Sequence, residues 1–189
     1  MSPTSAQACA ALAAGDLAEP QQVLGPRPVG TSGWRIGVWH PDSVGAELLL
    51  QGEGSKSLPA TSTPGFFEAR VPGGDRPQYQ VRFRFGDGST LDTQDPYGFP
   101  VTLGELDLHL FAEGTHRRLY KALGAHPMVQ GGVEGVRFAV WAPRARRVSV
   151  VGDFCRWDGR RLPMRRIGAS GVFELFVPGV GRGAVYKYE

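Results

Sequence analysis

The feature that most restricts the fold is an internal repeat, in which two distant stretches carry the same strand-like residues in the same order. The matches are Val38–Pro41 with Val140–Pro143, Gly65–Glu68 with Gly171–Glu174, Val71–Pro72 with Val177–Pro178, and Tyr79 with Tyr186. The separation between partners stays between 102 and 107 residues. Because a steady offset is typical of a duplicated unit, the repeat predicts two copies of one domain of about 100 residues, the usual size of an immunoglobulin-like β-sandwich.

Short strands and tight turns are expected throughout. The chain has 27 glycines and 15 prolines among 189 residues, which favours many short elements over a helical bundle. Residues 34–39 alternate in the manner of a half-buried strand, and Gly86–Ser89 is a hairpin signal. Further strands are predicted at residues 47–50, 65–71, 78–85, 90–92, 136–142, 148–152, 171–177 and 184–189. A (β/α)₈ barrel needs about 200–250 residues and does not fit.

Two segments predict helices. Residues 5–17 are rich in alanine and leucine after the capping residue Ser5, and residues 104–123 form a connector with one or two helical turns at 117–121. The expected fold is therefore mainly β, with two tandem immunoglobulin-like β-sandwiches, a short N-terminal helix and a helical connector. The expected division is a helical segment at 1–24, a first sandwich at 25–103, the connector at 104–126 and a second sandwich at 127–189.

The second copy of the repeat is shorter than the first. At an offset of 107 residues, Glu189 matches Arg82, which lies inside a predicted strand of the first copy. The first copy continues through a hairpin for which the second copy has no counterpart. We therefore expect the chain to be a fragment whose second sandwich is truncated.

Charge and cysteine usage restrict the class of protein. Residues 1–116 carry 7 basic and 13 acidic side chains, and residues 117–189 carry 14 and 5. This asymmetry can indicate a nucleic-acid partner, but the arginines lie among strand and turn residues, which favours a basic surface facing water or an acidic neighbouring domain. Two cysteines give no disulfide framework, and no apolar run is long enough to span a membrane. A cytoplasmic protein is the simplest interpretation.

The sequence offers no catalytic or metal-binding constellation. The four histidines are scattered, with no two at metal-ligand spacing, and no nucleophile motif or phosphate-binding glycine-rich loop is present. Asp153 and Asp158 are interpreted as turn residues. We therefore expect no catalytic residue, no metal and no cofactor in this chain.

The tryptophans are the remaining candidates. Trp34, Trp39 and Trp141 lie within alternating strands and are expected to pack in the core. Trp157 lies in a polar turn between Asp153 and Arg160, where its ring is expected to be partly exposed. An exposed ring beside hydrogen-bonding groups suits a sugar, while the alternative is that Trp157 folds back to cap its own sandwich. The residues alone leave both interpretations open.

The second half of the chain resembles a known family. Its motifs are Val136–Pro143, Val148–Gly159 (VSVVGDFCRWDG), Gly171–Pro178 and Tyr186–Glu189. They are similar to the family 48 glucan-binding module, which precedes the catalytic barrel in branching and debranching enzymes. Further upstream, the motifs Asp95–Phe99, Gly104–Leu110, Glu113–His116, Leu123–Pro127 and Val23–Pro26 resemble bacterial 1,4-α-glucan (glycogen) branching enzymes.

This resemblance implies a parent enzyme that cuts an α-1,4-glucan and transfers the released chain to a 6-hydroxyl, making an α-1,6 branch. Such enzymes are retaining and use two carboxyl groups, which would lie on a barrel beyond Glu189, so this chain alone is expected to be inactive. The resemblance also implies that Trp157 stacks on glucan and that Lys187 donates hydrogen bonds to it. Many relatives have Asn where this chain has Cys155, whose thiol is a weak hydrogen-bonding group.

The expected partners are α-1,4-glucan or glycogen and the enzyme's own catalytic barrel. The chain is expected to be monomeric, with neither a nucleic-acid nor a membrane partner. Two alternatives remain: the parent enzyme is a glycogen or starch debranching hydrolase that carries the same module, or the basic second half binds nucleic acid. Nucleic-acid affinity would fall steeply with salt, whereas binding of an uncharged glucan would not.

Overall fold

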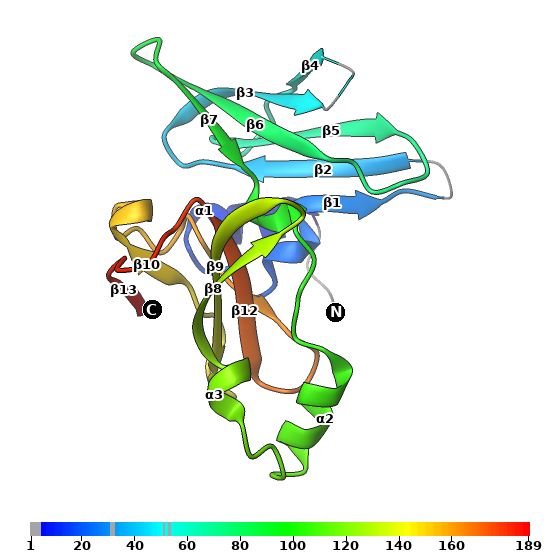
Figure 1. Ribbon diagram of the computed structural model, residues 1–189. Coiled ribbons are helices and arrows are strands. Elements are labelled where there is room, and N and C mark those ends of the chain that lie inside the picture. The colour runs from blue at the N-terminus through cyan, green and yellow to red at the C-terminus, as the bar shows by residue number, and fades with distance from the viewer. Residues whose placement is uncertain (1–4, 31–32, 51, 53) are drawn as a thin grey trace. The chain divides into compact units, whose positions relative to one another are not determined.

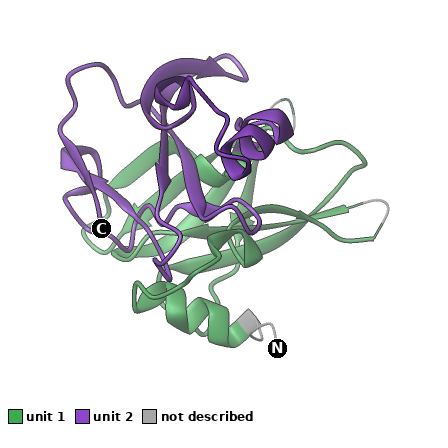
Figure 2. Cartoon of the chain, turned by 90° about the horizontal axis from the view of Figure 1, so that it is seen from below, with its two compact units in different colours: residues 1–98 green, residues 99–189 purple. Residues whose placement is uncertain are grey.

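The computed structural model describes residues 5–30, 33–50, 52 and 54–189. The chain divides into two compact units, Met1–Gly98 (unit 1) and Phe99–Glu189 (unit 2), which Figure 2 shows in different colours. Each unit contains antiparallel sheets, so the predicted mainly β fold is confirmed. Within the described residues, no helix is long and apolar enough to cross a membrane.

Unit 1 consists of one helix followed by strands. Its elements are α1 (Ser5–Ala13), η1 (Pro20–Gln22), β1 (Gly25–Pro28), β2 (Gly33–Trp39), β3 (Ser43–Leu50), β4 (Gly54–Leu58), β5 (Phe66–Pro72), β6 (Tyr79–Phe85), β7 (Thr90–Gln94) and η2 (Pro96–Gly98). One sheet has the order β1-β2-β5 and the other β4-β3-β6-β7 (Figure 1). Ile36 and Val38 of the first sheet share one buried cluster with Leu48 and Val81 of the second, so this unit is a sandwich.

The N-terminal helix is shorter than the predicted range 5–17, and it ends next to Gly15, which the sequence offers as a terminator. The helix ends at Ala13, because Gly15 adopts a φ of 71° and the next amide bonds back to Ala11. A glycine in this left-handed conformation is a common helix terminator. Leu17 is nevertheless buried and contributes to the core beyond the helix.

Unit 2 begins with the connector and continues as strands. Its elements are α2 (Glu105–Ala112), α3 (Leu119–Ala122), β8 (Gly124–Gln130), β9 (Val133–Trp141), β10 (Val150–Gly152), η3 (Asp153–Cys155), β11 (Arg165–Arg166), β12 (Val172–Pro178) and β13 (Tyr186–Tyr188). One sheet has the order β11-β12-β9-β8, and β10 pairs with β13. The predicted helical connector and the four main strands of the second copy are therefore present.

The two units repeat the same strand pairing residue by residue. The equivalent pairs in units 1 and 2 are Val38–Phe67 and Val140–Phe173 in one sheet, and Leu50–Tyr79 and Gly152–Tyr186 in the other. The predicted repeat is therefore a structural duplication in which β2 matches β9, β5 matches β12, β3 matches β10 and β6 matches β13.

Four strands lie where the sequence predicts none. β1 and β8 each form the edge of a sheet and each contains proline, while β4 and β11 are short and polar. Proline removes a backbone donor and weakens the strand signal, although an edge strand tolerates it because one side of the strand needs no partner. The proline-containing segment Gly25–Pro28 therefore contributes an edge strand.

The connector is tied to unit 2 by a buried carboxylate. Glu174 of β12 is 1% exposed and accepts hydrogen bonds from the backbone amides of Thr102 (2.6 Å) and Leu103 (3.0 Å). The Thr102 hydroxyl donates to the same carboxylate at 3.1 Å. Because a buried charge needs such donors to replace water, these bonds fix the chain just before α2. Leu103 and Ala122 then pack with residues of β9 and β12 in one buried cluster.

Candidate functional site

Trp157 lies in an unusual turn directly after β10. Arg156 has a φ of 56° and Trp157 a φ of 59°, and they are the two non-glycine residues with positive φ in the described part of the chain. A bulky residue in this region is strained and persists only where its surroundings hold it. Here the Trp157 amide donates to the Gly152 carbonyl (2.9 Å) and the Arg156 amide to the Asp153 carbonyl (3.1 Å). These two hydrogen bonds therefore hold the turn that carries Trp157 in this conformation.

The Trp157 indole is hydrogen-bonded through its N–H and is partly exposed to solvent. Its Nε1–H donates to Oδ1 of Asp153 at 2.7 Å, and the residue is 41% exposed. The predicted partial exposure of Trp157 is thus confirmed. Because the polar edge of the indole is already satisfied by Asp153, its apolar faces remain for packing against another apolar surface.

Cys155 stabilises the turn from inside. Its side chain is buried, and its sulfur accepts a hydrogen bond from the Gly152 amide at 3.3 Å. The thiol also lies 3.4 Å from the Gly152 carbonyl. The thiol therefore bonds within the turn that carries Trp157 and does not reach the surface as a ligand contact.

The β10–β13 pair brings Lys187 near this turn. Lys187 lies opposite Val151, one residue before Gly152, whose carbonyl accepts the Trp157 amide. The lysine is exposed, whereas Tyr186 on the adjacent position is half-buried and packs edge-on against Phe138 at 4.8 Å between ring centroids. Lys187 therefore lies on the strand paired with β10, which precedes the turn that carries Trp157, and alternation along β13 puts its side chain on the face opposite Tyr186.

Two ion pairs lie in and near this turn, Arg160 with Asp158 and Arg147 with Glu189. Arg160 donates to both carboxylate oxygens of Asp158, and this contact holds the pKa of Asp158 below its ordinary value. Arg147 forms an ion pair with Glu189 at 2.8 Å. Burial raises the pKa of Tyr188, so this phenol stays neutral in the physiological range.

Trp141 differs from the expectation of a core residue. It is 53% exposed and meets Phe111 of α2 edge-on at 5.5 Å between ring centroids. It is the last residue of β9. Trp34 and Trp39 are half-buried rather than fully packed. Burial of these three rings was therefore overpredicted, because strand alternation does not show where the covering layer ends.

Asp153 is the site residue that sequence reasoning missed, since its position suggests only a turn residue. Its distance of four residues from Trp157 within a polar turn is the signal that could have identified it. The histidines bond locally: His116 contacts Asp107 (2.9 Å) and His126 contacts the Leu123 carbonyl (2.9 Å). Among the residues with described positions, no group of three or more His, Cys, Asp or Glu side chains could hold a metal ion.

Two family matches cover most of the chain. Residues 5–97 match the family described as the N-terminal domain of the alpha-1,4-glucan branching enzyme GlgB. Residues 122–189 match carbohydrate-binding module 48, described as the isoamylase N-terminal domain.

Curated relatives agree with these matches. The chain is 46% identical over 179 residues to the 1,4-alpha-glucan branching enzyme GlgB of Paramagnetospirillum magneticum, covering 95% of this chain and 24% of that protein. It is 49% identical over 173 residues to the enzyme of the same name from Pseudomonas fluorescens, covering 90% and 23%. The chain therefore spans about a quarter of the length of the curated relatives it matches.

Solved structures give weaker likenesses. A pullulanase type I from Bacillus subtilis, complexed with maltose, shares 17% identity over 87% of this chain and 22% of that chain, with a TM-score of 0.29. A pullulanase from Anoxybacillus sp. LM18-11 complexed with maltotriose gives the same identity and TM-score over 88% and 24%. These likenesses carry no argument about function.

Proposed function

We propose that this chain is the non-catalytic N-terminal part of a 1,4-α-glucan branching enzyme, because residues 5–97 match the N-terminal domain of that enzyme and residues 122–189 match carbohydrate-binding module 48. The whole enzyme cuts an α-1,4-glucan chain and transfers it to a 6-hydroxyl in glycogen. The chain contributes glucan binding and influences the length of the transferred chain. The match of residues 5–97 carries the proposal, because it concerns the branching enzymes by name.

Within this role, Trp157 is the stacking platform for an α-1,4-glucan and Lys187 donates hydrogen bonds to sugar hydroxyls. The support is geometric: the indole is 41% exposed, its polar edge is held by Asp153, and Lys187 lies on the paired strand. The C–H face of a pyranose packs on an indole face, and an ammonium group supplies three donors. One ring and a few hydrogen bonds give a dissociation constant on the order of 0.1–1 mM.

The cellular setting belongs to the same proposal. The chain functions in the cytoplasm as part of a monomer, next to its own catalytic barrel and without a nucleic-acid or membrane partner. Within this proposal the chain comprises a helical start at 1–24, a first sandwich at 25–103, a connector at 104–126 and a glucan-binding module at 127–189. On its own it has no branching activity, because the carboxyl groups of the reaction belong to the barrel.

A debranching hydrolase remains the second candidate for the parent enzyme. Module 48 by itself favours it equally, since the matching family is also described as the isoamylase N-terminal domain. Residues 5–97 favour the branching enzyme. Assay of the full-length enzyme decides between them, because formation of α-1,6 branches and hydrolysis of α-1,6 links are distinct products.

Titration with maltoheptaose tests the binding site. The 189-residue chain is compared with Trp157→Ala, Lys187→Ala and the matched control Trp141→Ala, which removes another exposed tryptophan of unit 2. We expect Trp157→Ala to weaken binding at the turn at least tenfold and Trp141→Ala to leave it unchanged. Lys187→Ala should weaken it several-fold. Equal affinity of the chain and Trp157→Ala at this turn would refute the assignment.

A further inference from the structure

Three arginines lie side by side across one sheet of unit 1. Arg27 of β1 lies opposite Arg35 of β2, and Arg35 lies opposite Arg70 of β5. Residues that lie opposite one another on neighbouring strands point to the same face of the sheet, with their Cβ atoms about 4.5–5.5 Å apart. The three side chains therefore share one face of the β1-β2-β5 sheet, in a line that we call the arginine row.

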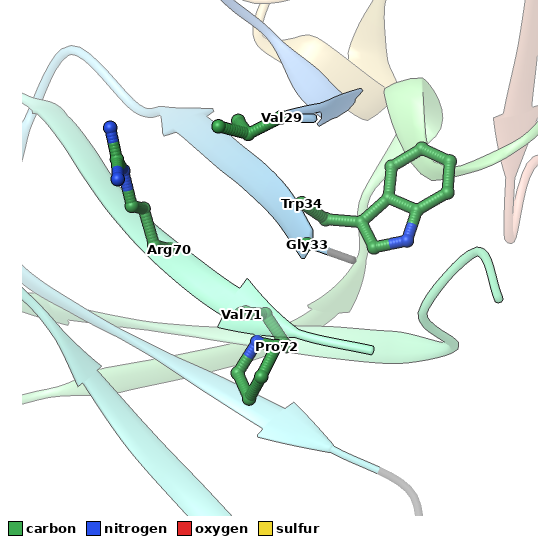
Figure 3. A pocket seen from close by; sticks show the side chains of 6 residues that line it. All are labelled: Val29, Gly33, Trp34, Arg70, Val71 and Pro72. Carbon is green, nitrogen blue, oxygen red and sulfur yellow. The ribbon is translucent and has the colours of Figure 1, made fainter. Parts of the chain in front are cut away.

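The arginine row lies on the outer face of this sheet. Ile36, which follows Arg35, and Ala69, which precedes Arg70, pack in the buried cluster of unit 1. Because side chains alternate along a strand, Arg35 and Arg70 point away from that cluster. Trp34, which precedes Arg35, belongs to the opposite face for the same reason. In Figure 3 the Arg70 side chain and the Trp34 indole, which line one pocket, extend to different sides. The indole therefore takes no part in the arginine row.

A single carboxylate pairs with the arginine row. Glu68 of β5 forms ion pairs with Arg27 and, at 3.7 Å, with Arg35. The Arg27 guanidinium also donates to the Gln22 carbonyl at 2.7 Å. Among the described residues, the Arg35 side chain donates no hydrogen bond, and the exposed Arg70 guanidinium has neither a hydrogen bond nor an ion pair. Two adjacent guanidinium groups therefore keep their donors for a ligand.

The equivalent positions of unit 2 are occupied and satisfied differently. Arg137 takes the position of Arg35 in the repeat. The residues opposite it are His126 of β8 and Phe176 of β12. The Arg137 guanidinium donates to the carbonyls of residues 121–122 at 3.0 Å, and Phe176 is buried. The duplicated fold therefore does not require three arginines in this row, and only unit 1 leaves a pair of them without hydrogen bonds.

The free pair of arginines is suited to a phosphate group. Like charges directly opposite each other in a sheet repel, and Lys56 adds a further positive charge, since its Nζ lies 2.6 Å from the Arg70 carbonyl. The guanidinium fork matches the oxygens of a carboxylate or a phosphate. A phosphate monoester has three terminal oxygens and nearly two negative charges at pH 7, so one group can accept hydrogen bonds from both arginines.

The size of the pair also restricts the ligand. Neighbouring strands are about 4.8 Å apart, so Arg35 and Arg70 can hold a single phosphate group between them. Binding of nucleic acid relies on several phosphate contacts along the strand. The other arginine of the row is already engaged by Glu68 and Gln22. The arrangement therefore favours one phosphate group on a small or uncharged molecule over a polymer of phosphates.

We propose that Arg35 and Arg70 form a binding site for a phosphate monoester on the outer face of the β1-β2-β5 sheet, with Arg27 and Lys56 adding to its positive charge. A small sugar phosphate and a phosphorylated glucan both carry this group. The glucan as a source of the phosphate rests on the proposed function of the chain, whereas the site itself does not.

An NMR titration of the ¹⁵N-labelled 189-residue chain tests this site. The probes are glucose 6-phosphate, phosphorylated maltodextrin and, without charge, maltoheptaose. We expect both phosphorylated probes, and not maltoheptaose, to shift the amide signals of residues 35 and 70. Arg70→Gln should weaken binding of glucose 6-phosphate at least about tenfold, because it removes charged hydrogen-bond donors. The control Arg84→Gln removes an exposed arginine from the other sheet of unit 1 and should change the affinity less than about twofold.

Thermal unfolding gives a second readout and shows that each variant folds. Without ligand, Arg70→Gln should unfold at the same temperature as the unchanged chain or slightly above it, because one of two like charges is removed. Glucose 6-phosphate should raise the unfolding temperature of the unchanged chain, since a ligand that binds only the folded state stabilises it. It should not raise that of Arg70→Gln, and an equal rise in both proteins would refute the site.

The remaining outcomes separate the site, its ligand and the proposed function. The tighter of the two phosphorylated probes identifies the source of the phosphate, and equal affinities show that the site recognises the phosphate group alone. No shift at residues 35 and 70 with either probe, or equal weakening in Arg70→Gln and Arg84→Gln, overturns the site. Stronger shifts with a short DNA duplex than with glucose 6-phosphate overturn the ligand class. The response of the Trp157 indole to maltoheptaose tests the proposed function alone, so either proposal can fail while the other stands.

Discussion

At the scale of single residues, the exposed ring of Trp157 depends on groups that never need to touch sugar. The Asp153 carboxylate accepts a hydrogen bond from the indole N–H at 2.7 Å, and the Gly152 carbonyl accepts one from the Trp157 amide. The Cys155 sulfur accepts a hydrogen bond from the Gly152 amide. A free tryptophan side chain loses rotamer freedom when it binds a ligand, and this loss opposes binding. A ring that is already fixed avoids part of that loss, so Asp153 acts as a positioning residue.

Asp153→Ala should therefore weaken maltoheptaose binding by about three- to tenfold, while Asp153→Asn, whose amide oxygen can still accept the indole proton, should weaken it less. The NMR shift of the Trp157 indole proton reports directly on the lost bond. Asp75→Ala, which removes an exposed carboxylate of unit 1, is the matched control. An unchanged affinity in Asp153→Ala, with the indole signal moved, would show that the bond fixes the ring without assisting binding.

At the scale of elements, the equivalent strands β6 and β13 differ in their partners. β6 pairs with β3 on one side and β7 on the other, whereas β13 pairs with β10 in a two-stranded sheet. Amide protons at the edge of a sheet are released by smaller openings than those at its centre. The same position in the duplicated fold is therefore more weakly protected in unit 2.

Hydrogen exchange should show this difference within one molecule. We expect residues 186–188 to exchange faster than their counterparts at residues 79–81, and residues 184–189 to be less protected than residues 34–97. Mass spectrometry of exchanged peptides resolves both comparisons under one set of conditions. Equal protection factors in β6 and β13 would contradict the expected weakness of the β13 edge.

The turn that carries Trp157 should also respond to acid through Asp158. Its pKa is lowered in the folded chain because Arg160 donates to its carboxylate. A lowered pKa stabilises the fold above the ordinary value of 3.8, and this contribution is lost as the pH falls through the folded value. Thermal unfolding should therefore show a loss of stability below about pH 4 that is smaller in Asp158→Asn. An identical acid profile in both proteins would argue against this role for Asp158.

Sequence patterns predict these elements unevenly, and the reasons are physical. The repeat anchored by Val38 and Val140 predicts the duplicated sandwich, because buried positions constrain residue type and register together. The edge strand at Gly25–Pro28 was missed, since its prolines are tolerated only where no second neighbour is needed. The left-handed Trp157 was missed as well, because its conformation depends on bonds to Gly152 and Asp153 rather than on its own preference.

At the scale of the whole molecule, charge separates the possible partners. The chain carries a formal net charge of +3, with its basic side chains concentrated in residues 117–189. Several of these are already engaged: Arg160 with Asp158, Arg147 with Glu189, and Arg137 with the carbonyls of Lys121 and Ala122. The basic excess of the second half is therefore partly occupied by contacts within unit 2.

Binding of maltoheptaose should accordingly be almost independent of salt. We expect less than a twofold change in affinity between about 50 and 500 mM sodium chloride, because an uncharged glucan releases no counterions. Binding through about six phosphate contacts would instead fall by three orders of magnitude or more between about 50 and 200 mM salt. Titrations of maltoheptaose and of a short DNA duplex at about 50, 200 and 500 mM sodium chloride measure the salt dependence of each affinity. Tight, salt-sensitive binding of the duplex would favour a nucleic-acid function.

The hydrogen bonds of Glu174 show that the folded second domain begins before the residues of the family match. The family match starts at residue 122, yet the donors that satisfy this carboxylate belong to Thr102 and Leu103. A protein cut at residue 122 would keep the negative charge and lose every one of those partners. The smallest second domain that can fold alone therefore starts near Phe99. Residues 99–121, which precede the family match, are part of that domain rather than a linker.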